Sequence, residues 1–320
     1  MTQVTPPAPR SFSTVGLPEE QRVELWETHN ADALIGLRCR TLTDSALDAT
    51  EVNLQLERVH MARVQGTSHV VERDLSLVRQ RPTQAVALFF GLRGEAFYYH
   101  DDGVRTLRPG QLLVCDADRP FMRGFSQGLE ELVLKVPQEV FAEATGIAAL
   151  PRPVVVPFGS GENPYAEALA HLVGSAVRED DPVVVHEGEL LELVGALASP
   201  GRPDGPTAYA AAARAYIERH LRDRSLSASK VAAAIGLSPR HLSRVFAELG
   251  TTFPQHVLAR RLDLARTMLE KPAVSSMTIA EVAHHCGFAS AAHFSNAFTA
   301  RFDERAADVR RRAVLARSLA

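Results

Sequence analysis

Cysteine is scarce in this chain of 320 residues, which contains only Cys39, Cys115 and Cys286. Three widely separated cysteines suit neither a disulfide framework nor a zinc-binding cluster. The chain also has no apolar run long enough to cross a bilayer, and residues 1–10 are polar and proline-rich, unlike a secretory signal. We therefore expect a cytoplasmic protein with reduced thiols and no contact with membranes.

Histidines that could hold a metal are few and scattered in the N-terminal half, where His60, His69 and His100 form no close His-x-His pair. A metal centre in a β-barrel needs a cluster such as two histidines and a carboxylate that converge on one ion. We expect no metal, no cofactor and no enzymatic activity. A metal-dependent enzyme is kept as an alternative, which metal analysis of the purified protein would decide.

Charge is divided unevenly along the chain. Residues 207–320 contain 17 Lys and Arg against 9 Asp and Glu, a net charge of +8, whereas the other 206 residues carry 18 against 29, a net charge of −11. A basic region joined to an acidic one suits a module that binds the phosphates of nucleic acid and releases their counterions.

A linker separates these two regions. Ser199–Pro206 contains five Pro and Gly in eight residues. With 46% hydrophobic residues, the chain is long enough for two domains with ordinary cores. We therefore predict a domain at 1–198, a linker at 199–206 and a second domain at 207–320.

The first domain is predicted to be a small antiparallel β-barrel or jelly roll, because residues 53–137 are rich in β-branched and aromatic residues and broken by turn signals. The segments with strand length are Gln84–Leu92, Glu95–His100, Gln111–Cys115 and Glu131–Val136. Helical patterns flank this region at Glu19–Leu37, Pro164–Arg178 and Val183–Ala198. The last two could form a hairpin that packs on the barrel or against another copy of the chain.

The second domain is predicted to be helical throughout and contains one pattern twice, 51–52 residues apart. The first copy comprises Val231-Ala232, Ile235-Gly236-Leu237, Ser238, Leu242 and Phe246. The second comprises Val282-Ala283, Cys286-Gly287-Phe288, Ser290, Phe294 and Phe298. Each copy, at about 226–249 and 278–301, predicts a short helix, a glycine turn and a second helix, which is the helix-turn-helix that reads the major groove of DNA.

Capping signals mark the ends of these helices. In the first unit, Ser227 is a candidate N-cap, Gly236 lies where a left-handed residue is expected, and Ser238-Pro239 begin the second helix. In the second unit, Thr278 and Glu281 match a capping box, Gly287 marks the turn, and Ser290 caps the next helix.

The outward faces of the second helices are the candidate base readers. In the first unit this face carries Arg240, His241, Ser243 and Arg244. An arginine can donate two hydrogen bonds to a guanine edge, worth about 1–3 kcal/mol of discrimination. In the second unit the outward polar residues are Ser295 and Asn296, the latter suited to adenine, whereas His293 is expected to be partly buried beside the core.

The two units are joined by a predicted helix at Pro254–Glu270, ended by Lys271-Pro272 and about 26 Å long. A rigid spacer of this size could place two recognition helices roughly one DNA turn, about 34 Å, apart. Arg260 and Arg261 on this helix are candidate phosphate contacts, although a solvated helix face explains them equally well.

A longer series of residues in the second domain is typical of a known family. The series comprises Arg261-Leu262, Ala265, Leu269, Ile279-Ala280, Ala283, Gly287-Phe288, Ser290, His293-Phe294 and Phe298. With it, residues 209–310 resemble the DNA-binding domain of the AraC/XylS family of bacterial transcription regulators. The resemblance implies that the outward residues named above face bases and that Ser227 and Thr278, at helix starts, lie near phosphates. Family members end this domain with a glycine, a Ser or Thr, a proline and an aromatic residue, where this chain has Asp303, Arg305, Ala306 and Val309.

The first domain is similar to the cupin-like sensory domain that many family members carry. The similar stretches are Glu20-Gln21-Arg22, Leu25-Trp26, Leu88-Phe89-Phe90-Gly91, Leu107-Arg108-Pro109-Gly110, Cys115-Asp116 and Arg119-Pro120-Phe121. Phe90, Tyr98 and Phe121 could line an effector pocket, although aromatic residues in short strands also form plain core. The expected fold is α+β: a cupin-like antiparallel β-barrel with flanking helices, then an all-α domain with two helix-turn-helix units.

The function predicted from these features is a sequence-specific DNA-binding transcription regulator controlled by a small-molecule effector in the barrel. The expected partners are double-stranded DNA and the effector, with RNA polymerase and a second copy of the chain as further candidates. The main alternative is a paralogue that has lost DNA binding through its atypical ending and acts by protein interaction.

Overall fold

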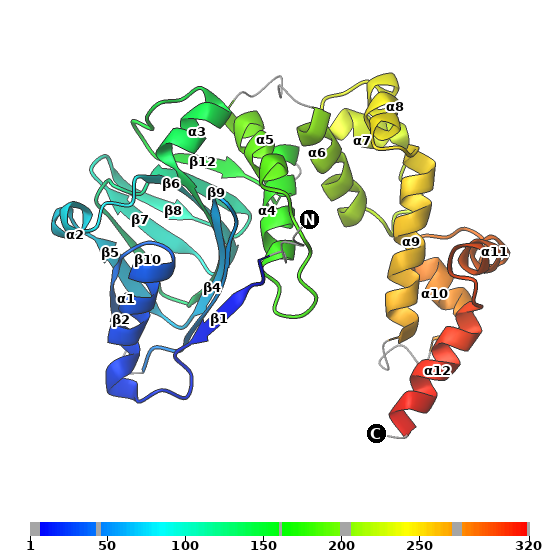
Figure 1. Ribbon diagram of the computed structural model, residues 1–320, viewed down its shortest axis with the longest axis horizontal. Helices are drawn as coiled ribbons and strands as arrows, with labels where there is room; N and C mark the ends of the chain where they lie inside the picture. The colour runs from blue at the N-terminus through cyan, green and yellow to red at the C-terminus, as the bar shows by residue number, and fades with distance from the viewer. Residues whose placement is uncertain (1–6, 43–45, 160–161, 199–205, 271–276, 319–320) are drawn as a thin grey trace, which may run out of the picture. The chain divides into compact units, whose positions relative to one another are not determined.

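The computed structural model describes residues 7–42, 46–159, 162–198, 206–270 and 277–318. The chain folds into two compact units, residues 1–211 and 212–320 (Figure 1). All but the last residue of the predicted linker Ser199–Pro206 lies outside the described residues. The boundary between the units falls inside α6 (Pro206–Arg219), the helix that follows it.

Two antiparallel sheets form the N-terminal unit (Figure 1). The larger sheet, in spatial order, consists of β1 (Arg10–Ser13), β3 (Ala49–Gln55), β4 (His60–Gly66), β11 (Leu129–Pro137), β6 (Ala85–Arg93), β9 (Gln111–Asp116) and β12 (Val154–Pro157). The smaller sheet consists of β2 (Arg38–Thr41), β5 (His69–Arg73), β10 (Phe121–Phe125), β7 (Ala96–His100) and β8 (Gly103–Leu107). The four strands predicted individually from the sequence correspond to β6, β7, β9 and β11, which confirms those predictions.

The core of the unit lies between the two sheets. Successive side chains of β6 point to opposite faces of the sheet, so Ala87 and Phe89 join the buried cluster between the sheets, which also contains Trp26, Tyr98 and Phe121. The two-sheet antiparallel architecture confirms the predicted cupin-like barrel.

Helices flank the barrel as predicted. They are the 3-10 turn η1 (Glu19–Gln21), α1 (Arg22–Ala33), α2 (Leu75–Gln80), α3 (Gln138–Thr145), α4 (Pro164–Ala176) and α5 (Glu187–Ala198). The Asn163 side chain accepts hydrogen bonds from the backbone amides of Tyr165 and Ala166, which begins α4. Helix α4 contacts β11, where a Cβ at Gly174 would lie 3.1 Å from Leu132, so the α4–α5 hairpin packs on the barrel.

Every described element of the C-terminal unit is a helix (Figure 1). After α6 follow α7 (Ala228–Ala234), α8 (Pro239–Glu248), α9 (Phe253–Glu270), α10 (Ile279–His285), α11 (Ala291–Phe302) and α12 (Ala306–Ser318). Its main core cluster joins Leu262, Ala265 and Leu269 of α9 to Phe294 and Phe298 of α11. This arrangement confirms the predicted α+β class; the predicted stop at Lys271-Pro272 lies outside the described residues.

No helix in the described ranges combines the length and the apolar character needed to span a membrane.

Candidate nucleic-acid interface

The first helix-turn-helix unit, α7 and α8, begins and turns where the sequence predicts. The Ser227 hydroxyl accepts a hydrogen bond from the amide of Lys230 at the start of α7. Gly236 adopts φ +71° in the turn. The Ser238 hydroxyl accepts from the amide of His241, with Pro239 in the first turn of α8. These local signals orient α8 against the unit's core.

The exposed face of α8 carries the predicted base readers. Leu242, Val245 and Phe246 are buried, whereas Arg240, His241, Ser243 and Arg244 are all exposed. Neither Arg240 nor Arg244 has a hydrogen-bonding or ionic partner among the described residues, so both guanidinium groups can meet a ligand. The Ser243 hydroxyl donates to the Pro239 carbonyl at 3.0 Å and keeps its acceptor lone pairs.

The second unit, α10 and α11, is built on a complete capping box. The Glu281 amide donates to the Thr278 hydroxyl at 3.1 Å, and the Thr278 amide donates to the Glu281 carboxylate at 2.6 Å. These hydrogen bonds lower the pKa of Glu281. Gly287 adopts φ +87°, and the Ser290 hydroxyl accepts from the His293 amide to begin α11.

The outward face of α11 is less polar than that of α8. Phe294 and Phe298 are buried, while Ser295 and Asn296 are exposed as predicted. His293 is also exposed, so the expectation that it is partly buried is wrong. Its place in the first turn of α11 puts the imidazole outside the apolar stripe that faces α9, although its ring centroid lies 6.1 Å from that of Phe288.

Helix α9 connects the two units over 18 residues, a length of about 27 Å. The Arg260 guanidinium donates to both carboxylate oxygens of Glu218 on α6 and also pairs with Asp263. Arg301 of α11 forms a bidentate pair with the same Asp263 at 2.9 and 3.1 Å. A series of ion pairs, Glu218–Arg260–Asp263–Arg301, thus connects α6, α9 and α11.

Arg260 and Arg261, the candidate phosphate contacts on α9, both bond within the protein in this structure. Arg260 is engaged by Glu218, and Arg261 donates to the carbonyl oxygens of Leu221 and Asp223 at 2.9 and 2.8 Å. Both side chains are only partly exposed. A helical pattern in the sequence cannot reveal this, because the loop that approaches α9 lies about 40 positions away in the chain.

The atypical end of the domain forms a left-handed turn. Asp303 is the C-cap of α11 with φ +52° and ψ +26°, and its amide donates to the Thr299 carbonyl. Ala306 and Val309, which replace the family's usual residues, are buried in the core of this unit, and Arg305 is exposed. The turn therefore forms with aspartate in a conformation that favours glycine.

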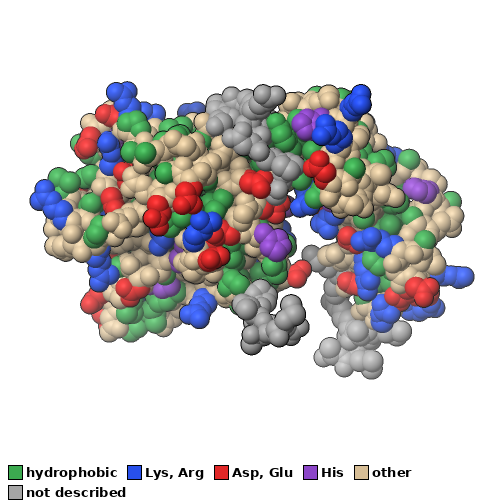
Figure 2. Space-filling view, turned by 45° about the horizontal axis from the view of Figure 1, so that its top comes forward, with side chains coloured by type: hydrophobic (Ala, Val, Ile, Leu, Met, Phe, Trp, Pro, Cys, Tyr) green, Lys and Arg blue, Asp and Glu red, His purple; other side chains and the backbone are tan. Residues whose placement is uncertain are grey.

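Basic side chains outnumber acidic ones in this part of the chain, 17 against 9 over residues 207–320. Figure 2 shows its Lys and Arg side chains in blue, with Asp and Glu side chains beside several of them. The net charge of +8 over residues 207–320 is therefore carried on a folded helical unit.

In the barrel, the three predicted effector-lining residues are differently placed. Tyr98 and Phe121 point into the interior, where their rings stack with centroids 5.7 Å apart. Phe90 instead packs against Phe158, on the opposite face of β6 from Phe89. The cavity that Tyr98 helps to line measures about 10 Å³, room for about one water molecule.

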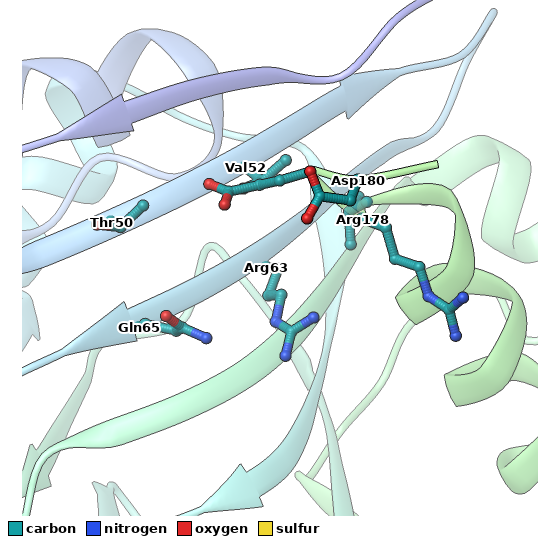
Figure 3. A pocket seen from close by; sticks show the side chains of 8 residues that line it. Thr50, Val52, Arg63, Gln65, Arg178 and Asp180 are labelled. Atoms are coloured by element: carbon teal, nitrogen blue, oxygen red, sulfur yellow. The ribbon is translucent and has the colours of Figure 1, made fainter. Parts of the chain in front are cut away.

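A larger recess of about 390 Å³ lies outside the barrel (Figure 3). Its walls are Thr50 and Val52 of β3, Arg63 and Gln65 of β4, and residues 177–180 after α4. The Arg63 guanidinium pairs with Glu130, but its buried Nε has no partner among the described residues. Positive and negative side chains thus line the same recess, which no sequence pattern indicated.

Polar side chains inside the barrel also escaped prediction. Glu51 is fully buried, neither of its carboxylate oxygens has a hydrogen-bond partner among the described residues, and His29 lies 3.7 Å away. Burial raises the pKa of Glu51 to about 7. Nε2–H of His60 donates to Oδ1 of Asn53 at 2.9 Å, and burial lowers the pKa of His60 to about 4.

The three histidines considered as metal ligands lie on three different strands, β4, β5 and β7. Within the described ranges, no three His, Cys, Asp or Glu side chains are grouped so that they could hold a metal ion. All three cysteines are buried free thiols.

Comparison with known proteins follows the same division of the chain. Residues 26–215, more than half of the chain, match a family model described as an AraC-binding-like domain, and residues 231–312 match a helix-turn-helix domain. The transcriptional activator RhrA of Rhizobium meliloti is 34% identical over 100 residues, 31% of this chain and 32% of RhrA, so that match spans about a third of its length. The transcriptional activator NphR of a Rhodococcus species is 22% identical over 261 residues, 76% of this chain and 75% of NphR.

Among solved structures, the AraC-like transcriptional activator CuxR is similar in fold. It aligns with a TM-score of 0.50 and 19% identity, over 80% of this chain and 94% of CuxR. A β-barrel domain followed by two linked helix-turn-helix units is the architecture of a class of DNA-binding transcription regulators. The chain belongs to the AraC/XylS family of these regulators.

Proposed function

We propose that this protein binds specific DNA sites by inserting α8 and α11 into two successive stretches of the major groove on one face of the duplex. The observation that supports this most strongly is the pair of exposed arginines on α8, which have no partner among the residues that the structure describes. Helix α8 is capped and is joined by α9 to a second capped helix. An α-helix fits the major groove, and a spacer of about 27 Å suits two grooves roughly one turn apart.

In this proposal the first unit reads bases and the second mainly positions the protein. Arg240 and Arg244 recognise guanine edges, and His241 and Ser243 add polar contacts. Asn296 recognises adenine, with Ser295 and the exposed His293 beside it. Ser227 and Thr278 approach phosphates through the exposed helix starts that their side chains cap.

The experiment is a salt-dependent binding assay of the full chain on the DNA upstream of its own gene. Affinity should fall steeply between about 50 and 200 mM salt, since phosphate contacts release counterions. Arg244→Ala should weaken binding by about 1–3 kcal/mol, whereas Arg105→Ala, an exposed arginine on β8 of the barrel, is the matched control and should leave affinity unchanged. Absence of binding even at low salt would favour the protein-interaction paralogue.

We further infer that a small molecule bound to the N-terminal unit regulates this DNA binding. Because the barrel interior around Tyr98 is filled, the recess beside Arg63 is a second candidate effector site. Its mixed charges suit a small polar molecule that carries both an acidic and a basic group. A thermal-shift screen with the wild type and Arg63→Ala separates the sites, because ligands of the recess lose their effect in the variant and ligands of the barrel keep it.

The remaining expectations are part of the same proposal. A transcription regulator of this kind acts in the cytoplasm, has no catalytic activity, and contacts RNA polymerase and a second copy of itself. Metal analysis tests the enzyme alternative, since stoichiometric iron, manganese or zinc in the purified protein would support it.

A further inference from the structure

The turn of the second helix-turn-helix unit packs tightly against the loop that follows α6. A Cβ at Gly287 would lie 2.8 Å from the Leu221 carbonyl oxygen and 2.9 Å from Nε of Arg261. Only glycine leaves room for this approach. Gly236, the equivalent residue of the first unit, also has a positive φ, but no described atom comes within 4 Å of a Cβ placed there. The close contact therefore belongs to the second turn alone.

Arg261 of α9 joins the two sides of this contact. Its Nε donates to the Leu221 carbonyl at 2.9 Å and its Nη2 donates to the Asp223 carbonyl at 2.8 Å. Carbonyls at a helix end have no intrahelical donor, and a planar guanidinium can satisfy two of them at fixed geometry. The loop after α6, which leads into α7 of the first unit, is thereby attached to α9 next to the second turn.

The loop itself is held in shape. The Asp223 carboxylate accepts hydrogen bonds from the Ser225 amide at 2.8 Å and the Ser225 hydroxyl at 2.6 Å. These bonds lower the pKa of Asp223 to about 2. One residue along, Nη2 of Arg224 lies 2.8 Å from Nδ1 of His284 on α10. The loop thus touches the second unit at its turn and at its first helix.

This contact is formed by Arg261, Gly287 and the loop at residues 221–224, and we name it the inter-unit strut, because it joins the two helix-turn-helix units. We propose that the strut fixes the distance and rotation between α8 and α11. The protein is then selective for the spacing between the two half-sites of its DNA target. The inference rests on the proposed function. Helix α9 already packs into the core of the second helix-turn-helix unit. The contact at Gly287 adds a second attachment, between the loop that leads into α7 and the second turn, and restrains how the first helix-turn-helix unit rotates about α9. Arg261 is therefore a positioning residue, not a phosphate contact.

Spacing selectivity follows from the geometry of DNA. One added base pair moves a half-site by about 3.4 Å and rotates it by about 35° around the helix axis. If the strut holds α8 and α11 in place, they cannot both reach half-sites whose spacing has changed, and base contacts are lost. If only α9 connects them, the helices can adjust in part to the new spacing.

The first test measures the distribution of distances between α8 and α11 in the absence of DNA. Spin labels are attached at Ala247→Cys on α8 and Thr299→Cys on α11, which are both exposed, while the three natural cysteines are buried. The distance distribution should be narrow in the wild-type background and clearly broader in Arg261→Ala and Gly287→Ala. Gly236→Ala is the matched control, because it strains the same kind of turn without touching the strut, and it should stay narrow. Equal widths in all four proteins would overturn the proposal.

The second test uses DNA sites selected from a random pool by the wild-type full chain, then shortened or lengthened by one base pair between the half-sites. The wild type should lose about tenfold or more in affinity on the altered spacings, and Arg261→Ala only about two- to threefold. An equal loss on every spacing, with a weaker salt dependence, would mean that Arg261 contacts a phosphate and would refute the strut. If the wild type binds no DNA, the proposed function fails, while the spin-label result still decides whether the strut exists.

Discussion

Single arginine residues of the C-terminal unit differ in whether they have bonding partners within the protein. Arg240 and Arg244 are exposed and have no described partner, whereas Arg260 and Arg261 are engaged by Glu218 and by backbone carbonyls. An arginine that has satisfied its donors inside the protein gains little from a phosphate, because the internal bonds must first break. The same residue type is therefore available to a ligand on α8 and bonded within the fold on α9.

The Arg260–Glu218 pair should stabilise the fold without contributing to DNA binding. Because both side chains remain partly exposed, a double-mutant cycle of Arg260→Ala and Glu218→Ala should give a coupling energy of about 1 kcal/mol or less in chemical denaturation. The salt dependence of DNA binding should be the same in Arg260→Ala as in the wild type. A weaker dependence of DNA affinity on salt concentration in Arg260→Ala would instead indicate that Arg260 contacts a DNA phosphate.

Glu51 should make the stability of the barrel depend on pH. Its pKa is raised from 4.5 in the unfolded chain to about 7 in the fold, so the folded state holds a proton that the unfolded chain releases. Stability is therefore highest below about pH 4.5 for this group and falls as pH rises through 7, by up to about 3 kcal/mol. Glu51→Gln should remove this decline, measured as denaturation midpoints of the barrel at pH 5 and 8. Glu95→Gln, which removes an exposed carboxylate, is the control; a decline that persists in Glu51→Gln would contradict the assignment.

At the scale of single elements, helix boundaries follow from local chemistry. Ser227, Ser238, Thr278 and Ser290 each accept the amide bond expected of an N-cap. The C-terminus of α11 is irregular, because Asp303 adopts a left-handed conformation there. A side chain in this conformation costs about 1 kcal/mol relative to glycine, although aspartate tolerates it better than most residues.

Asp303→Gly should therefore stabilise the C-terminal unit by up to about 1 kcal/mol, seen as a higher unfolding temperature of this unit. It should also tighten DNA binding a few-fold, since it removes a negative charge near the second recognition helix. Asp303→Asn separates the two effects, because it removes the charge and keeps a side chain that tolerates the left-handed turn. If both variants bind DNA no better than the wild type, the carboxylate does not weaken the second unit.

The elements that could be predicted are those with strong local signals. Capped helices and strands bounded by turns were found from the sequence, as were the exposed faces of α8 and α11. The face of the sheet on which Phe90 lies could not be predicted, because β6 is a run of apolar residues in which polar and apolar residues do not alternate. The burial of Glu51 could not be predicted either. A polar residue in a strand predicts a side chain that points outward, and Glu51 is buried only by the packing of α1 and the barrel.

At the scale of the whole molecule, function depends on two separately folded units. In the N-terminal unit, the cavity beside Tyr98 has room for about one water molecule and a charged recess lies on the outer face of the barrel, while the C-terminal unit carries the excess of positive charge. Effector control requires that the effector bind the DNA-competent and DNA-incompetent states with different affinities. In the proposed mechanism, paired reading of DNA depends on contacts between residues distant in sequence, such as that of Arg261 with the loop after α6.

The central claim is that one chain reads two stretches of the major groove on one face of DNA. Hydroxyl-radical footprinting of the wild-type full chain on its selected site tests this directly. Two protected segments centred about 10–11 base pairs apart should appear on the same face of the duplex. A single protected segment, or two segments on opposite faces, would contradict the account.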